Sequence, residues 1–500
     1  MHNIEKKNYY TELDNEYKYE LNKLDKRYNT ISALRAVVFI FAVALLIIGF
    51  KDDIFVSKFI GILGAVAFFA LVAVHSKVSS KQRWMKSVSA VTERYIKRFE
   101  EGWREFGDDG HEFLEAGATV PVDIDLLGRS SLYQMINVAH TPEGRRRLAN
   151  ALCAAPKLET VELTGRQEAS VELAGKRDFS IRFEALCEQL GLGKRNIDID
   201  RMVGACDDET DMPLWANIIR FIFPITEIIL IILCAIGLVN IGVPILGFIV
   251  ILAFSWLTKT VTDSIIAPFY SAGFAVDGYR EMMELIANTE FASDKLNQIK
   301  RVYGGSDGVI TAVRKLANIC QAFNIMYNPL IHQLLSGLIL WDYQIAAVTL
   351  AWKRRYSDRI AEGFEGIYEM EFLSSLATIA RVKEVSIPKV NYDTDRKLMF
   401  SADGLYHPLI YSENVVANSA ELEAGITIIT GSNMSGKTTF LRTIAVNLVL
   451  AYIGAPVCAG GLEADYMKLF TSMRVTDDVE HGISTFYAEI LRIKAMAEYK

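Results

Sequence analysis

The stretch that decides the fold is Gly431-Ser432-Asn433-Met434-Ser435-Gly436-Lys437-Thr438-Thr439. It has the form G-x-x-x-x-G-K-[ST], which is typical of phosphate-binding loops. Small residues let backbone N–H groups close around a phosphate, and the start of a helix adds a positive dipole end. An apolar strand is expected over 426–430 and a helix over 440–446, which is the context that the motif requires. In such a loop Lys437 reaches the β- and γ-phosphates, and the Thr438 hydroxyl holds Mg²⁺. The alternative is a plain glycine turn.

The bulk composition bounds the class of protein. The chain has 500 residues, enough for two to four domains, and 51% of them are hydrophobic. The net charge of −7 offers no general basic field for nucleic acid, so any DNA contact has to be local. The six cysteines are scattered without paired spacing, which indicates a reducing compartment rather than a disulfide or zinc scaffold. The polar first 30 residues predict no cleavable signal peptide.

The first third of the chain predicts a membrane hairpin between polar helices. Residues 1–32 are expected to form an amphipathic helix. A more specific alternative is that this helix forms a coiled coil or binds a partner. Two apolar runs within 33–76, joined by a short polar turn, predict transmembrane hairpin 1; the alternative is a buried soluble hairpin. Residues 77–120 are interpreted as a basic juxtamembrane helix that places this side in the cytoplasm. Its cations either bind anionic lipid or only set the topology.

A soluble helical part, 121–212, precedes a second apolar pair. Thr141 is the expected N-cap and Pro142 the first residue of a helix, and the arginines at 145–147 are expected on a solvated face. Residues 215–258 predict transmembrane hairpin 2. Glu227 lies near one end of it, where snorkelling to the interface competes with a functional role.

The remaining chain divides into helices and an α/β part. The apolar stretch 325–350 carries several polar residues, and we expect long core helices there rather than a further crossing, which would place the phosphate loop outside the cell. Residues 259–387 are expected to be helical and 388–500 to form an α/β domain.

A second motif lies downstream, over 477–489. Ser484 and Thr485 fit an N-cap before a helix when read alone. Together with the phosphate loop, however, this segment closely resembles the ATPase domain of the MutS DNA mismatch-repair proteins, which it matches over 404–500. The matching pieces are His407-Pro408, 416–418, 430–442, 451–454 and 477–489, and a weaker likeness to the family's core and lever parts covers 125–210 and 260–387.

The resemblance implies a homodimer with two ATP sites near the subunit interface. Residues 431–438 hold the phosphates within one subunit, and Gly482, Ser484 and Thr485 correspond to the signature segment that approaches the partner's γ-phosphate. ATP then draws the subunits together, and the levers transmit the closure.

Four departures from the family pattern limit this reading. The chain has no N-terminal mismatch-reading domain, and a 221–257 hairpin stands where the family inserts its DNA clamp. Val415 replaces an aromatic residue that stacks on adenine. The acidic pair of the family, which binds Mg²⁺ and activates water, has no counterpart before Lys500, so we expect the sequence to be truncated and ATPase activity to belong to the intact protein.

These observations predict a mixed fold: multi-pass membrane α-helical hairpins, an α-helical core and lever domain, and an incomplete α/β P-loop ATPase domain. The expected function is that of a membrane-anchored, ATP- and Mg²⁺-binding member of the family in a bacterial cytoplasmic membrane, with the N-terminus and the ATPase domain cytoplasmic and with membrane lipid and a second subunit as partners. Binding of mismatched DNA is an alternative that the net charge does not support. An ATP-driven transporter and a non-hydrolysing scaffold are alternatives of another class.

Overall fold

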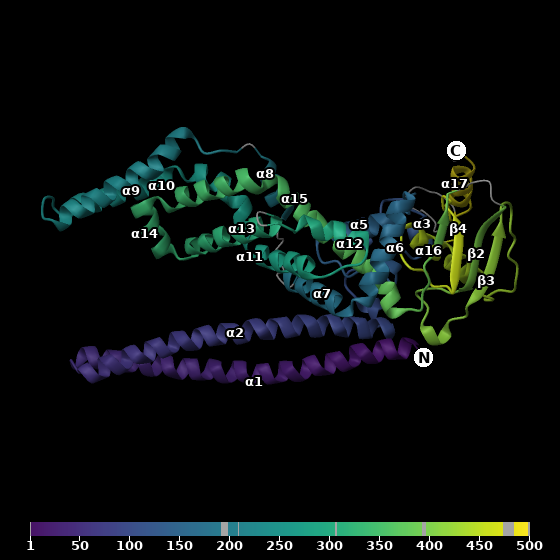
Figure 1. Cartoon of the computed structure of the whole chain (residues 1–500), viewed down its shortest axis with the longest axis horizontal. Helices are drawn as coiled ribbons and strands as arrows, with labels where there is room; N and C mark the ends of the chain where they lie inside the picture. The colour runs from purple at the N-terminus through teal and green to yellow at the C-terminus, as the bar shows by residue number, and fades with distance from the viewer. Residues whose placement is uncertain are drawn as a thin grey trace. The chain divides into compact units, whose positions relative to one another are not determined.

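The computed structural model describes residues 2–191, 199–208, 210–305, 308–392, 397–473 and 485–498. These residues are mostly helical and include one small sheet (Figure 1). The chain divides into two compact units: residues 1–191 with 371–500 form unit 1, and residues 192–370 form unit 2. The division falls inside a single long helix, α15 (Trp341–Val382).

Unit 1 begins with two long antiparallel helices, α1 (His2–Lys51) and α2 (Phe55–Phe99), which lie side by side (Figure 1). The sequence pattern predicted three separate elements in this region: a polar helix, a hairpin and a basic helix that extends to residue 120. Each arm is instead one unbroken helix, and α2 ends at Phe99. No proline or capping glycine interrupts the chain where the polar and apolar parts meet, so each helix continues across the boundary.

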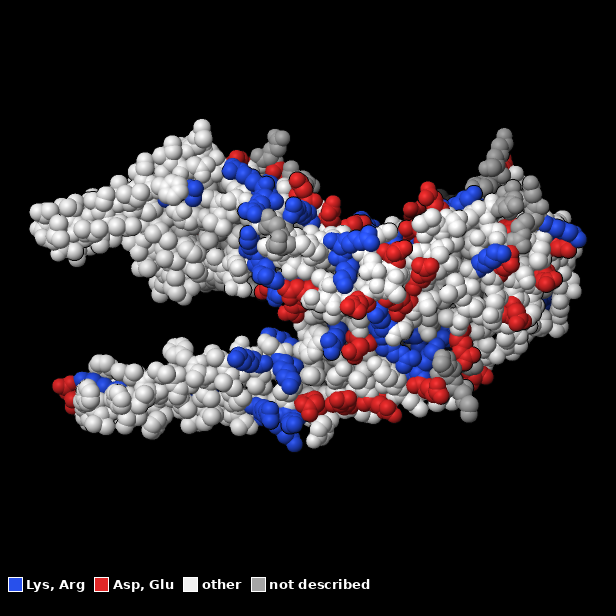
Figure 2. Space-filling model, viewed as in Figure 1, with Lys and Arg blue, Asp and Glu red and all other residues white. Residues whose placement is uncertain are grey.

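Small residues bring the two arms close together. A Cβ atom on Gly61 would lie 2.7 Å from Leu46 Cγ, and one on Gly64 would lie 2.8 Å from Ala42 Cβ. Asp53, with φ of 53°, turns the chain between the arms. Near this turn the large apolar side chains face outward; Phe55 is 78% and Phe69 is 69% exposed. Figure 2 shows this part of the hairpin almost free of charged side chains, except at the turn, with lysines and arginines gathered where the polar part begins.

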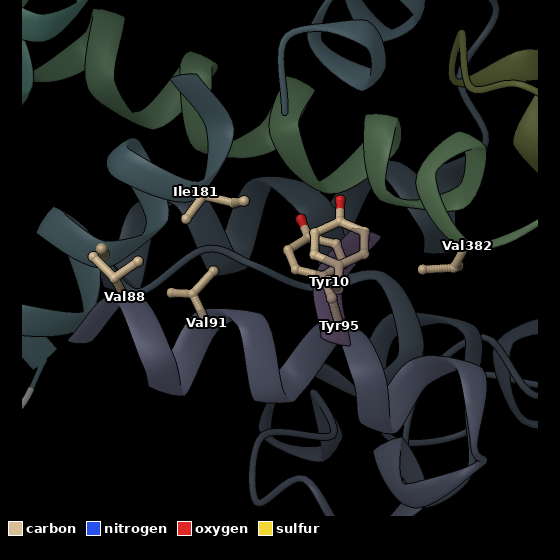
Figure 3. Close-up of a cluster of buried hydrophobic side chains, with 7 residues drawn as sticks. Tyr10, Val88, Val91, Tyr95, Ile181 and Val382 are labelled. Atoms are coloured by element: carbon tan, nitrogen blue, oxygen red, sulfur yellow. The ribbon is translucent and has the colours of Figure 1, made fainter. Parts of the chain in front are cut away.

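The other end of the hairpin is packed into unit 1. Tyr10 of α1 stacks on Tyr95 of α2, with ring centroids 4.6 Å apart (Figure 3). Val88 and Val91 join them, together with Ile181 and Ala185 of α7 (Arg177–Gly191) and Val382 at the end of α15. The hairpin therefore has a buried base and an exposed apolar tip.

A buried charge pair lies beside this cluster. Arg381 of α15 donates to Glu184 Oε1 of α7 at 3.0 Å, and both side chains are fully buried. The same guanidinium donates to Tyr95 Oη, to Ser180 Oγ and to the Leu173 carbonyl. One side chain therefore joins the hairpin to α7 and to the end of α6 (Thr160–Gly175).

The rest of unit 1 consists of short helices and the sheet. Thr141 caps α5 (Pro142–Ala154) by accepting a hydrogen bond from Gly144 N at 3.0 Å, so the predicted N-cap is confirmed. The shorter elements are η1 (Gly102–Glu105), η2 (His111–Phe113), α3 (Val120–Asp123), α4 (Leu132–Ile136) and η4 (Ser412–Asn414).

The sheet has the strand order β1-β4-β2-β3. β1 (Lys389–Asn391) and β4 (Gly461–Asp465) are parallel, whereas β2 (Leu398–Leu405) runs antiparallel to both β4 and β3 (Asn418–Glu423). α16 (Lys437–Tyr452) and α17 (Thr485–Glu498) complete the unit.

One predicted strand is absent. Residues 426–430, before the phosphate loop, pair with no strand among the described residues. Ile426 is 94% and Ile428 is 79% exposed. An apolar run becomes a strand only when a neighbouring strand supplies hydrogen-bond partners, and no described neighbour does so here.

The regular structure of unit 2 consists of helices in the residues that the structure describes. Its helices are α8 (Ile199–Asp207), α9 (Leu214–Ala235), α10 (Gly242–Leu257), α11 (Lys259–Asn288), α12 (Asp294–Val302), α13 (Val309–Phe323), η3 (Asn324–Tyr327), α14 (Pro329–Ile339) and the first part of α15. α9 and α10 form a hairpin, and α14 packs against both.

We expected long core helices over 325–350, but the helix there is interrupted and partly exposed. The chain bends by 81° at Leu340, between α14 and α15. Leu330 is 80% and Leu334 is 54% exposed, so α14 leaves an apolar face uncovered. The bend follows from Leu340, which adopts a left-handed conformation with φ of 52° and ends the helix.

In the part of the chain that the structure describes, three helices are long and apolar enough to cross a membrane: Ile4–Lys51, Phe55–Phe99 and Leu214–Ala235. Two bent pairs, Gly242–Leu257 with Lys259–Tyr270 and Pro329–Ile339 with Trp341–Val382, raise this number to as many as five if each pair is one span. This finding rests on length and composition alone.

The buried charge pair gives a first prediction. Arg381→Met leaves the Glu184 carboxylate buried without its partner and should lower the free energy of unfolding by about 3–5 kcal/mol, as measured by urea titration of the full chain in detergent. Arg182→Met, on the same helix as Glu184, removes only an exposed contact of 3.6 Å with Asp178 and should cost less than about 0.5 kcal/mol. Equal effects of the two variants would contradict the role given to Arg381.

Candidate nucleotide site

The predicted phosphate loop ends at the first turn of α16. Gly436 is the N-cap of this helix and has φ of 90°, a conformation that residues with a Cβ atom rarely adopt. Met434 is also left-handed, with φ of 65°, and is fully exposed. The loop thus turns sharply into the helix, and the first N–H groups of α16, which have no acceptor within the helix, point toward it. The predicted loop and the helix after it are both present.

α16 is held firmly behind this loop. Asn447 is fully buried, and its amide donates to the Tyr406 carbonyl at 3.1 Å while its Oδ1 accepts from Cys458 N at 2.8 Å. Arg442, nearer the loop, contacts the Asp125 carboxylate at 3.1 Å. These bonds fix the helix to the segments that follow β2, precede β4 and follow α3, so the positive end of α16 has a defined position.

Lys437 lies over the loop. Its ammonium donates to the Gly431 carbonyl at 2.8 Å and to the Ser432 carbonyl at 2.5 Å, and it approaches Ser435 Oγ at 3.5 Å. Among the residues described here, the oxygens that hold the ammonium are therefore neutral. An anion on the loop would give it a stronger, charge-assisted partner within the same reach.

A cavity of about 510 Å³ opens beside the loop. This volume is in the range of small-molecule and cofactor sites. Its lining includes Ser435, Gly436, Lys437 and Thr439 of the predicted site, and also Ile410, Asn414, Val415 and Val416. The lining therefore combines a cation and helix-start residues with apolar side chains, a combination that fits a nucleoside triphosphate.

The remaining predicted site residues lie outside the lining of this cavity. Gly431, Ser432, Asn433 and Met434 belong to the loop but do not line the cavity. Thr438, the predicted Mg²⁺ ligand, is an exposed residue in the first turn of α16. Among the described residues no group of three or more His, Cys, Asp or Glu side chains could hold a metal ion. A single hydroxyl together with phosphate oxygens and water suits the way Mg²⁺ is usually held at phosphates.

His407 forms part of the cavity wall and is neutral. Burial, aided by the nearby Arg442 and Lys383, lowers the pKa of His407 to about 4, although Asp125 opposes the shift. Its Nδ1 accepts a hydrogen bond from Leu409 N at 3.3 Å. The imidazole therefore fixes the turn that carries Ile410 and adds no charge to the site.

The cavity wall is tied to the hairpin by hydrogen bonds that the sequence did not reveal. Lys383, just after α15, donates from Nζ to the Ile410 carbonyl at 3.0 Å, and Arg104 donates to the Leu409 carbonyl at 2.9 Å. Lys6 of α1 donates to the Lys383 carbonyl at 2.8 Å and to the Ala380 carbonyl at 2.9 Å. Burial lowers the pKa of both Lys6 and Lys383. These lysines belong to no motif, and no spacing in the sequence identifies them.

Most of the predicted partner-facing segment lies outside the residues that the structure describes. Gly482 and Ser484 lie outside the described residues. Thr485 is the first residue of α17, and its side chain is not described.

Comparison with known proteins gives one family. A profile of the MutS domain V family matches residues 427–499, which include the phosphate loop and α16. The DNA mismatch repair protein MutS of Staphylococcus saprophyticus is 31% identical over 160 residues, which are 31% of this chain and 18% of that protein. The proteins of the same name from Clostridioides difficile and Staphylococcus aureus are 32% identical over 137 residues and 29% identical over 161 residues.

The matched part is short relative to these proteins. It spans 27% and 32% of this chain for the latter two, and 14% and 18% of their own lengths. The likeness therefore covers only a minor part of these relatives, and the family match includes the phosphate loop and α16 but not the cavity wall at 407–419. Residues 427–499 of this chain are therefore similar to domain V of the MutS family.

Proposed function

We propose that this chain is a membrane-anchored ATP-binding protein of the MutS family in which occupancy of the nucleotide cavity acts on the α1–α2 hairpin. One observation carries the proposal: Lys383 bonds to the cavity wall through Nζ and to the hairpin through its carbonyl oxygen. The relatives are named as DNA mismatch repair proteins. We do not assign that function to this chain on the basis of one shared domain.

The binding step uses residues that lie together at the loop. Lys437 neutralises phosphate charge, and the N–H groups at the start of α16 donate to phosphate oxygens. The Thr438 hydroxyl is the proposed ligand of Mg²⁺. Val415 and Ile410 offer an apolar surface to the base, without an aromatic ring to stack on it. Bound ATP supplies a phosphoanhydride, and its negative charge is complementary to Lys437 and to the start of α16.

The coupling step passes through the turn at 407–410. An occupant that shifts Val415 or Ile410 also shifts the Ile410 carbonyl, which is the acceptor of Lys383. Lys383 follows α15 directly, and α15 carries Arg381, the buried partner of the hairpin base. The cavity wall and the hairpin base thus both bond to one short segment of chain, 380–383.

The membrane part of the proposal rests on the exposed apolar tip of the hairpin. A soluble protein rarely exposes such a continuous apolar surface. Lys77, Lys81, Arg83 and Lys86 follow the apolar part of α2, and this arrangement favours a cytoplasmic location for the hairpin base and for the nucleotide cavity. A homodimer and ATP hydrolysis by the intact protein are proposed from the family resemblance alone.

Recognition of mismatched DNA is the second candidate function. The printed names of the relatives favour it. The net charge of −7 is unfavourable for phosphate backbones, and the relatives match this chain over less than a fifth of their own length. Tighter binding of heteroduplex than of homoduplex DNA by the detergent-solubilised chain would establish it in place of our proposal.

The nucleotide site gives a second prediction. Lys437→Ala removes the ammonium that meets the phosphates and should weaken binding of a fluorescent ATP analogue at least about tenfold, because a hydrogen bond to a charged group contributes about 1.5–3 kcal/mol. Lys389→Ala serves as the control, since this exposed lysine of β1 contacts only Glu463, at 3.2 Å. Unchanged affinity in Lys437→Ala would show that ATP does not bind at this loop.

The coupling gives a third prediction. We expect ATP to slow amide hydrogen exchange at residues 88–99 of α2 in the wild-type chain, and we expect Lys383→Met to remove most of this protection. The substitution breaks the bond to Ile410 but keeps the residue 383 carbonyl that Lys6 uses, so it separates the cavity from the hairpin at one point.

Lys397→Met is the matched control, because that lysine is highly exposed and contacts only the exposed Glu423. The coupling would be refuted by a wild-type chain whose exchange at 88–99 ignores ATP. If instead Lys383→Met kept the full protection, coupling would exist but would follow another route.

A further inference from the structure

Unit 2 contains a cavity where two helices break. The chain bends by 62° at Thr258, between α10 and α11, and by 81° at Leu340, between α14 and α15. Tyr343, in the first turn of α15, donates its hydroxyl to Thr258 Oγ1 at 2.7 Å. The two breaks are therefore joined to each other, and they lie within segments that are otherwise apolar enough to enter a membrane.

The cavity at this place has a volume of about 460 Å³. Ile249, Leu252 and Ala253 of α10 form its apolar wall. Trp256 lies at its rim and is 77% exposed, and tryptophan favours the boundary between hydrocarbon and water. The surface that α9, α10 and α14 present in Figure 2 is almost without charged side chains. One side of the cavity therefore suits a hydrocarbon chain.

Polar groups also line the cavity. His332 and Ser336 are one turn apart on α14 and so lie on one face of that helix. His332 Nε2 lies 2.8 Å from Asp342 Oδ1, and the Asp342 side chain is only 5% exposed. Ser336 is 3% exposed, and its hydroxyl has no hydrogen-bond partner in the described part of the chain. A buried hydroxyl without a partner is costly, so this one points to an acceptor supplied by a ligand.

The charge balance selects the kind of ligand. The carboxylate that lines the cavity, Asp342, is already engaged with His332. Lys259 also lines the cavity, and its nearest carboxylate, that of Asp263, lies 3.8 Å from Nζ at a half-exposed position where ion pairs contribute little. Lys259, Ser336 and the Gln333 amide therefore offer donors to a ligand, Lys259 adds a positive charge, and the carboxylate of the lining is engaged.

We propose that this cavity binds the headgroup of a phospholipid, with the phosphate on Lys259 and Ser336 and an acyl chain along the α10 wall. Ile249 of this wall is 52% exposed, so the apolar wall extends from the cavity to the surface. This inference rests on the membrane placement in the proposed function and is independent of ATP binding. A free phosphate ester shares the headgroup chemistry but lacks the chain.

The test uses the full chain in detergent micelles and a fluorescent phosphatidylglycerol as probe. Wild type should bind this probe at least about tenfold more tightly than a diacylglycerol with the same label and chains, because the phosphate accepts charge-assisted bonds. Lys259→Met and Ser336→Ala should each weaken binding of the phosphatidylglycerol and leave the weak binding of the diacylglycerol unchanged. Ser264→Ala is the control, since that exposed serine of α11 bonds only to the Val261 carbonyl and lies outside the cavity.

Several results would overturn the assignment. Equal affinity for the two labelled lipids would exclude a phosphate site, and so would unchanged binding in both variants. Displacement of the probe by glycerol 3-phosphate at a comparable concentration would make this a site for a small anion instead.

The proposed lipid site and the proposed nucleotide site can be tested independently of each other. Lys437→Ala should keep the lipid affinity, and Ser336→Ala should keep the ATP affinity. A chain that binds the probe in detergent but does not float with vesicles would refute the membrane placement and still support the phosphate-binding cavity.

Discussion

The Arg381–Glu184 pair is the interaction on which unit 1 depends. Two fully buried charges are tolerated only when each is paired and hydrogen-bonded, and this requirement fixes their neighbours. Arg381 donates hydrogen bonds to Tyr95 of the hairpin, to Glu184 of α7 and to the Leu173 carbonyl of α6. These three elements must therefore pack together around its side chain. A hairpin whose tip is suited to lipid gains little from packing at that end, and its position is set at this base.

The same short segment of chain serves the nucleotide cavity. Arg381 faces the hairpin base, and two residues later Lys383 bonds to the cavity wall. Both residues are buried, Arg381 in the last turn of α15 and Lys383 directly after it, and in the proposed function a displacement of one is transmitted to the other. In the proposed function, domain V supplies the phosphate loop, and this helix end replaces the long-range levers expected from the family as the nearest link to the membrane.

The sequence predicted the parts of this structure that depend on local patterns. The phosphate loop and α16, the Thr141 cap and the apolar helices of both hairpins all follow from spacing and propensity. The strand expected over 426–430 did not form, because a strand depends on a partner that a local pattern cannot supply. The Arg381–Glu184 pair joins residues 197 positions apart, and the bond from Lys383 to Ile410 ends on a backbone carbonyl, which no side-chain motif records. The bend at Leu340 was hidden for a similar reason, since a leucine rarely adopts positive φ.

Sided thiol labelling tests the central claim, a membrane hairpin attached to a cytoplasmic ATP site, most directly. In a cysteine-free background, Asp53→Cys marks the turn between α1 and α2, and Glu413→Cys marks an exposed position beside the nucleotide cavity. With an impermeant reagent and sealed inside-out vesicles, our account predicts that position 413 is labelled, that ATP slows this labelling, and that position 53 reacts only after the vesicles are permeabilised. Labelling of position 53 before permeabilisation, or labelling at 413 that ATP does not alter, would contradict the account.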